Sequence, residues 1–78
     1  MQHRLKIDEE YFSAVIRGKK KFEIRFNDRG YKIGDAIILQ EIDDDGLFTG
    51  RKITGIITYI TNYKQKDGYI VFGFEITL

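Results

Sequence analysis

The sequence predicts an α+β domain that is mostly β: five strands in a mainly antiparallel, barrel-like sheet, with one helix near the N-terminus. Three observations lead to this prediction. Five segments alternate apolar and polar residues or are rich in β-branched and aromatic residues. Turns containing glycine or aspartate separate most of them, and only one segment has the spacing of an amphipathic helix. The 78 residues contain no linker or repeat, so we expect one domain, residues 1–78.

The first two elements follow one another directly. Residues 3–7 alternate polar and apolar side chains, which predicts a short strand. Asp8 is a suitable N-cap, and an apolar stripe follows it, so we expect a helix over residues 9–17. Gly18 comes directly after the stripe and can adopt the left-handed conformation that ends many helices.

Four further strands are predicted, over residues 20–26, 36–42, 50–62 and 69–77. Asp45-Gly46, between the second and third of these, is a strong hairpin signal. Alternation within the strands predicts which side chains enter the core. We expect a core formed by Phe22, Ile24, Phe26, Ile70, Phe72, Phe74 and Ile76, covered by Phe12 and Ile16 of the helix.

Composition excludes several classes of protein. There is no cysteine and only one histidine, so we expect neither a disulfide nor a cysteine- or histidine-based metal site, and no cofactor is indicated. No apolar run is long enough to span a membrane and no signal peptide opens the chain, so a cytoplasmic location is expected.

Positive charge is concentrated in one segment. Residues 17–32 carry seven lysines or arginines and two acids, a net charge of +5 in a chain whose net charge is +1. Such asymmetry indicates a polyanionic partner.

This basic segment contains the candidate site residues. Glu23 and Arg25 are two apart on a predicted strand, so their side chains share a face. They could form a solvated surface ion pair of little energetic value, or a pocket in which Arg25 binds a phosphate or base edge while Glu23 orients it. On a regular strand the side chain of Lys20 would point to the opposite face. It can join Glu23 and Arg25 only if the chain is still turning at Lys20. In the following turn, Arg29 is a second candidate cation, and Tyr31 is a candidate platform for stacking a base.

The spacing Gly18-x-Lys20-x-x-Glu23-x-Arg25 resembles the G-x-K-x-x-E-x-R signature of ASCH domains, members of the PUA-like superfamily. The resemblance extends over the whole chain to a compact bacterial and phage subfamily of uncharacterised function. Its other matching segments are His3-x-Leu5-Lys6-Ile7, Tyr11-Phe12, Asn27-Asp28-Arg29-x-Tyr31, Gly34-Asp35 and Thr49-Gly50-Arg51.

The resemblance implies a PUA-like five-stranded pseudo-barrel and a basic cleft beside the helix that binds RNA or a modified nucleoside. Lys20, Glu23 and Arg25 correspond to the signature by position, whereas Arg29 and Tyr31 correspond only through the subfamily pattern. An RNA-binding module is therefore the function we expect from the sequence.

Two alternatives remain open at this point. Some ASCH relatives are amidohydrolases of acetylated cytidine, with a lysine base at the position of Lys20 and a threonine nucleophile at the position of Glu23. Because a glutamate replaces that threonine, we expect that the chain is not such an enzyme, although Lys20 and Glu23 would be the residues to test. The second alternative is a module that binds a protein partner through an exposed strand edge.

Overall fold

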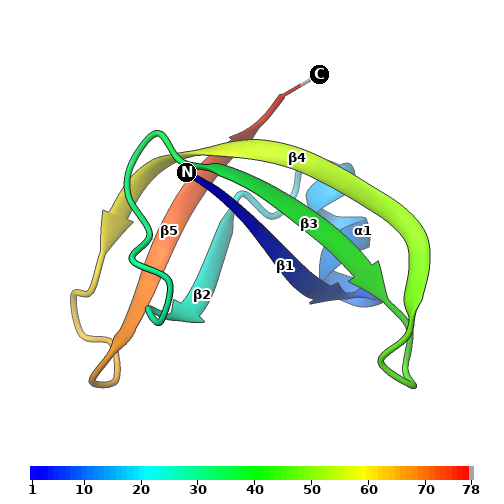
Figure 1. Cartoon of the computed structure of the whole chain (residues 1–78), viewed down its shortest axis with the longest axis horizontal. Helices are drawn as coiled ribbons and strands as arrows, with labels where there is room; N and C mark the ends of the chain where they lie inside the picture. The colour runs from blue at the N-terminus through cyan, green and yellow to red at the C-terminus, as the bar shows by residue number, and fades with distance from the viewer. Residues whose placement is uncertain (78) are drawn as a thin grey trace.

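The computed structural model describes residues 1–77 and contains one helix and one five-stranded sheet (Figure 1). The elements are β1 (Gln2–Asp8), α1 (Glu9–Ile16), β2 (Phe22–Phe26), β3 (Ala36–Ile42), β4 (Phe48–Thr61) and β5 (Tyr69–Ile76). The sheet order is β1-β3-β4-β5-β2, and every pair is antiparallel except β1 with β3. The predicted class, mostly β with a single N-terminal helix, is confirmed.

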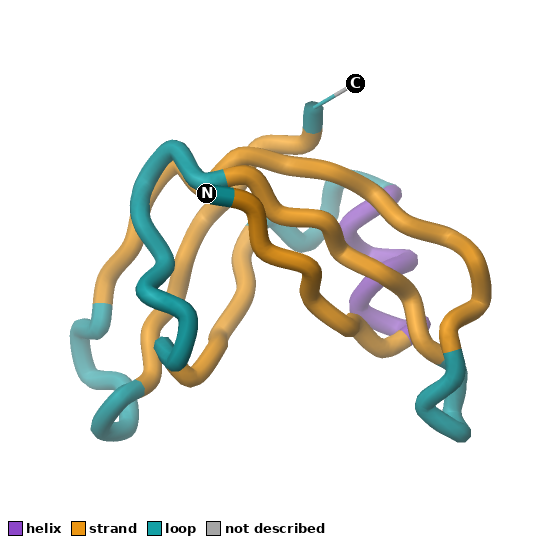
Figure 2. Tube along the Cα trace, viewed as in Figure 1, coloured by secondary structure: helices purple, strands orange, loops and turns teal. Residues whose placement is uncertain are grey.

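The sheet curls into a half-barrel whose two edge strands, β1 and β2, stand on either side of an opening (Figure 1). The tube in Figure 2 shows α1 packed at one end of this curl. Parallel pairing of β1 with β3 requires a long crossover, and residues 9–35 provide it, carrying α1 and β2. This crossover brings the basic segment to the opening. No helix within residues 1–77 is long and apolar enough to cross a membrane.

Helix α1 begins and ends close to the predicted positions, but its N-terminus is stabilised differently from the prediction. Asp8 occupies the N-cap position and makes no side-chain capping hydrogen bond there; it is also the last residue of β1. Glu9 and Glu10 in the first turn interact favourably with the positive end of the helix dipole. Gly18, with φ of +71°, lies just beyond the helix, as predicted.

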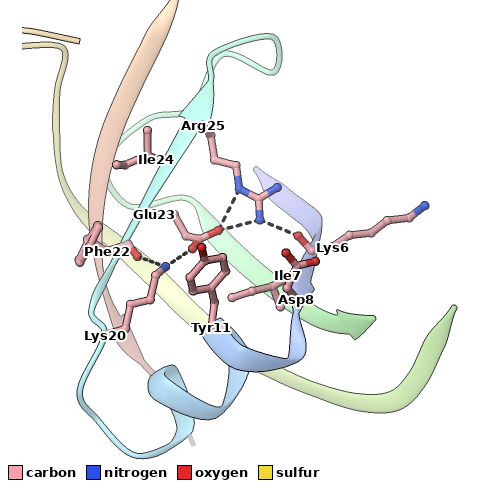
Figure 3. A pocket seen from close by; sticks show the side chains of 9 residues that line it. All are labelled: Lys6, Ile7, Asp8, Tyr11, Lys20, Phe22, Glu23, Ile24 and Arg25. Atoms are coloured by element: carbon pink, nitrogen blue, oxygen red, sulfur yellow. Dashed lines mark hydrogen bonds and ion pairs between the residues drawn. The ribbon is translucent and has the colours of Figure 1, made fainter. Parts of the chain in front are cut away.

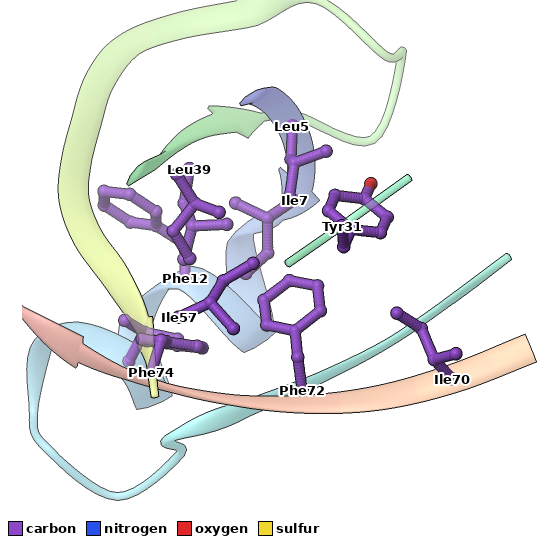
Figure 4. Packing of buried hydrophobic residues seen from close by; sticks show 11 residues of the cluster. Leu5, Ile7, Phe12, Tyr31, Leu39, Ile57, Ile70, Phe72 and Phe74 are labelled. Atoms are coloured by element: carbon purple, nitrogen blue, oxygen red, sulfur yellow. The ribbon is translucent and has the colours of Figure 1, made fainter. Parts of the chain in front are cut away.

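The core lies inside the curl, between β5 on one side and β1, β3 and α1 on the other (Figure 4). Its centre is Phe72, which is fully buried and contacts the rings of Tyr31 and Phe74. The prediction is confirmed for Phe12, Ile70, Phe72 and Phe74 and wrong for the other five side chains. Three of these lie on β2; the other two, Ile16 and Ile76, are also exposed, and Val15 covers the core in place of Ile16. The buried cluster comprises Leu5, Ile7, Phe12, Val15, Tyr31, Ile37, Leu39, Ile57, Ile70, Phe72 and Phe74.

Strand β2 alternates as predicted, but the assignment of its faces is wrong. Phe22, Ile24 and Phe26 are about half exposed and point away from the core, whereas Glu23 is only 5% exposed and lies on the inner face. The register with β5 explains this, because Glu23 is paired with the buried Phe72 and must share its side of the sheet. An edge strand can place a carboxylate inward when cations reach it from the open side, and here two cations do so.

A buried carboxylate also joins β3 to β4 beside the acidic hairpin. Glu41 is 2% exposed and accepts hydrogen bonds from Thr49 Oγ1 (2.6 Å) and from Arg51 Nε (2.9 Å) and NH2 (2.8 Å). The hydrogen bonds from Arg51, followed in importance by the one from Thr49, lower the pKa of Glu41. The cluster lies next to the irregular pairing between Gln40 and Ile42 and holds the bent β4 against β3.

A second buried polar cluster joins β1 to the turn before β3. His3 Nε2 lies 2.8 Å from Asp35 Oδ2, which also accepts a hydrogen bond from the Lys32 backbone N–H at 3.0 Å. Although β1 is an edge strand, His3 is only 4% exposed. The hydrogen bond with His3 is the main reason why the pKa of Asp35 falls from 3.8 to about 2.

This lowered pKa predicts a loss of stability in acid. The unfolded chain binds a proton on Asp35 at higher pH than the folded chain does, so the contribution of Asp35 is present above about pH 4 and is lost as the pH falls toward about 2. We expect Asp35→Asn to be less stable than wild type at pH 5, with a difference that narrows steadily to pH 2. Urea denaturation of both proteins at each pH measures this, and a constant difference would contradict it.

Candidate functional site

A cleft of about 530 Å³ opens between the two edge strands, beside α1 (Figure 3). One wall is the end of β1, the second is Tyr11 of α1, and the third is β2 together with Lys20, two residues before the strand. The residues that line it are Lys6, Ile7, Asp8, Tyr11, Lys20, Phe22, Glu23, Ile24 and Arg25. Its volume lies in the range of about 300–1,000 Å³ that is usual for small-ligand pockets.

Glu23 organises the polar side of this cleft. One carboxylate oxygen accepts hydrogen bonds from Arg25 Nε at 2.9 Å and NH2 at 2.6 Å, and the other is paired with Lys20 Nζ (Figure 3). The carboxylate is nearly buried, while the side chains of Lys20 and Arg25 remain 15% and 25% exposed. Two cations on one buried anion leave a net positive charge that faces the opening.

Each cation is also held by the backbone. Lys20 Nζ donates to the Phe22 carbonyl at 2.6 Å, and Arg25 NH2 donates to the Lys6 carbonyl on β1 at 2.7 Å. The second contact crosses the opening, so Arg25 links the two edge strands that no backbone ladder joins. The cations are therefore held in place before any ligand arrives.

Aromatic rings form the apolar part of the cleft. The Lys20 ammonium lies 4.9 Å from the Phe22 ring centroid and 5.5 Å from that of Tyr11, within the range of cation–π attraction. Both rings are nearly half exposed. A planar ligand could stack on either ring while its polar groups reach Lys20 or Arg25.

The total charge of the cleft is small. Lys6, Lys20 and Arg25 contribute three positive charges, and Asp8 and Glu23 contribute two negative ones. This balance favours a compact ligand with one or two anionic groups over a long stretch of polyanion backbone.

The structure brings together three of the five predicted site residues: Lys20, Glu23 and Arg25. Arg29 does not line the cleft. It lies further along the opening, where its NH1 donates to the Arg4 carbonyl of β1 at 2.7 Å. Arg25 and Arg29 thus both contact backbone carbonyls of β1 across the opening.

The prediction of Tyr31 as a stacking platform is wrong. Its side chain is 6% exposed, with its ring centroid 4.7 Å from that of His3 and 5.2 Å from that of Phe72. Burial raises the pKa of its hydroxyl, opposed by the charges of Arg29 and Arg25. Tyr31 is a core residue because the turn that carries it folds inward over the open end of the sheet.

Tyr11, Phe22 and Lys6 line the cleft but are not among the predicted site residues. Alternation predicts Phe22 in the core, and the sequence does not distinguish Tyr11 from a packing residue of the helix. One signal in the sequence is the spacing of Lys20 and Phe22, which are two apart and so share a face of an extended segment. Within residues 1–77, no group of three histidine, cysteine, aspartate or glutamate side chains is placed to hold a metal ion.

Comparison with known proteins gives two matches. Residues 2–74 match the model of a family described as "Domain of unknown function (DUF3850)". A relative from Escherichia phage P2, named "Uncharacterized 12.9 kDa protein in GpA 3'region", is 45% identical over 60 residues. The aligned region covers 77% of this chain and 54% of the relative, so the chain spans about half of the relative's length.

Proposed function

The chain belongs to the DUF3850 family, and from this premise and the geometry of the cleft we propose that it binds single-stranded RNA by receiving one nucleotide between β1, α1 and β2. The observation that carries the proposal is the arrangement of Lys20 and Arg25 on one buried carboxylate, beside two exposed aromatic rings. Positive charge next to aromatic stacking surfaces is the usual means by which proteins bind single-stranded nucleic acid.

Each group has a role in this proposal. A base stacks on Tyr11 or Phe22, which is worth about 1–3 kcal/mol per base. Arg25 binds the phosphate through guanidinium N–H groups, and Lys20 adds a second charge. Glu23 holds both cations in position, and it is the group in the cleft that would accept a hydrogen from an exocyclic amine of the base.

We also propose that the chain is an ASCH-type member of the PUA-like superfamily. Two features support this assignment. The signature residues Lys20, Glu23 and Arg25 lie in one cleft beside the helix, where the resemblance expects them. The half-barrel with one N-terminal helix is compatible with a PUA-like pseudo-barrel.

We expect Arg25→Ala to weaken binding of a short single-stranded RNA at least about tenfold, because a charged hydrogen bond contributes about 1.5–3 kcal/mol. Wild-type affinity should fall with salt along a shallow slope that reflects about two or three phosphate contacts. Fluorescence anisotropy of labelled RNAs of six nucleotides and random sequence, over a salt series, measures both. A thermal melt of each variant shows whether it is folded at the temperature of the binding assay.

Two variants serve as controls. Arg17→Ala removes the same kind of side chain from an exposed position that does not line the cleft, and Asp44→Ala removes a charge from the acidic hairpin. Neither should weaken binding. Equal affinity of wild type and Arg25→Ala for every RNA would contradict the proposal. If wild type hydrolysed an acylated nucleoside and Lys20→Ala did not, the enzyme alternative would replace the RNA-binding proposal.

A further inference from the structure

The outer face of β2 and β5 carries an apolar surface that the monomer leaves uncovered. Phe22, Ile24 and Phe26 are 45%, 55% and 52% exposed, and Tyr69 on the neighbouring strand is 39% exposed. Binary patterning would place polar side chains on a face turned to solvent. We define the outer face by the outward positions of β2, β5 and the adjoining part of β4: Phe22, Ile24, Phe26, Tyr59, Tyr69, Val71 and Gly73.

Strand pairing makes these positions one continuous surface. Phe22 is paired with Gly73 and Phe26 with Tyr69, whose rings meet edge-on at a centroid distance of 5.4 Å. Gly73 is in turn paired with Tyr59 on β4, which is 66% exposed. Gly73 contributes no side chain to this surface between Phe22 and Tyr59. Among the outward positions of β2 and β5, only Glu75 near the end of β5 carries a charge. Aromatic enrichment with charge depletion is characteristic of the centre of a protein interface.

Charges of both signs stand at the two ends of the outer face. At the Phe22 end are Lys19, Lys21 and Glu75; at the Tyr69 end are Lys64, Lys66, Asp28 and Asp67. Four lysines against three acids give a nearly balanced rim. A polyanion or an anionic membrane would favour a rim of predominantly positive charge, whereas a balanced rim suits a protein surface that also carries both signs.

We propose that the outer face is the interface of a homodimer in which two copies pack sheet on sheet about a twofold axis perpendicular to the strands. Such an axis places the Phe22 end of one copy against the Tyr69 end of the other. Lys21 then faces Asp67 of the second copy, and Glu75 faces its Lys64 and Lys66. The two sheets bury their aromatic side chains against each other, as in an aligned β-sandwich. Phe22 and Ile24 also line the cleft, so the dimer covers its β2 rim and leaves Tyr11 as the ring on which a base can stack.

Sedimentation velocity over a concentration series tests this proposal. We expect wild type to dimerise and Ile24→Lys to weaken dimerisation about 30-fold or more, the size of a hot-spot loss, because the lysine would lie at the centre of the interface. Ile33→Lys is the matched control: Ile33 is 59% exposed and lies outside the outer face, so this variant should dimerise like wild type. Circular dichroism of all three should show the same folded monomer, because both replaced side chains are exposed.

A charge exchange tests the orientation of the two copies. Lys21→Glu and Asp67→Lys should each weaken dimerisation, and the double variant should recover it, because the exchanged charges again face one another. A wild type that stays monomeric at millimolar concentration would overturn the proposal, as would an Ile24→Lys protein that dimerises normally. With wild type monomeric, loss of RNA affinity in Phe26→Lys, which replaces an outer-face side chain that does not line the cleft, would instead assign the outer face to nucleic acid.

Discussion

Replacing Phe72 by alanine is expected to lower the free energy of unfolding by about 3–5 kcal/mol. Phe72 is fully buried at the centre of the core, where its ring contacts those of Tyr31 and Phe74. Truncation removes the buried area of the ring and leaves a cavity that the curled sheet cannot fill. A domain of this length has a total stability of about 4–12 kcal/mol, so the variant loses at least about a quarter of it and unfolds if the wild type lies at the low end of that range. Urea denaturation followed by circular dichroism measures the change.

Phe26→Ala is the matched control for this experiment. It makes the same chemical change on a side chain that is 52% exposed on the outer face, so its effect should be about 1 kcal/mol or less. Both variants should be compared at protein concentrations low enough to keep the chain monomeric. If Phe26→Ala were the more damaging of the two, the face assignment of β2 in the structure would be wrong.

Replacing Glu23 by glutamine is expected to cost about 3 kcal/mol, although the two side chains have nearly the same shape. Lys20 and Arg25 converge on the carboxylate, and the amide would leave both cations without a counter-charge in a cleft that is only partly hydrated. Their residual exposure places the cost at the lower end of the range known for broken buried ion pairs. Urea denaturation at low and high salt measures it, and the loss should change little with salt, because buried pairs are weakly screened.

Asp44→Asn is the control for the charge change. Asp44 is exposed on the acidic hairpin, so neutralising it should alter stability by about 0.5 kcal/mol or less. A Glu23→Gln protein as stable as wild type would mean that Lys20 and Arg25 are already solvated without the carboxylate. In that case Glu23 would not hold the cations in place, and its role in the proposed RNA site would be lost.

The elements of this fold follow from local patterns. The five strands and the helix begin and end within about two residues of the positions that periodicity and turn signals predict. The hairpin at Asp45-Gly46 forms where its dipeptide predicts it, with Gly46 at a φ of +78°. Such features depend on neighbouring residues, so they can be recognised without knowledge of the rest of the chain.

The site was only partly predictable. Clustering of charge along residues 17–32 pointed to Lys20, Glu23 and Arg25, which do meet in one cleft. The same reasoning could not separate Tyr31, which is buried, from Tyr11, which lines the cleft. The difference depends on which way each segment folds over the sheet, and residue type carries no such information.

The sequence by itself determined the number and order of the elements, the alternation of β2 and the shared face of Glu23 and Arg25. Only the tertiary structure decided which face of β2 lies inside. Alternation has a period of two and is satisfied equally well by either face. Pairing of Glu23 with Phe72 resolved the choice, because the buried carboxylate meets Lys20 and Arg25 at the open edge of the half-barrel. As a result, the three apolar side chains of β2 face outward, and Glu23 lies in the cleft with Lys20 and Arg25.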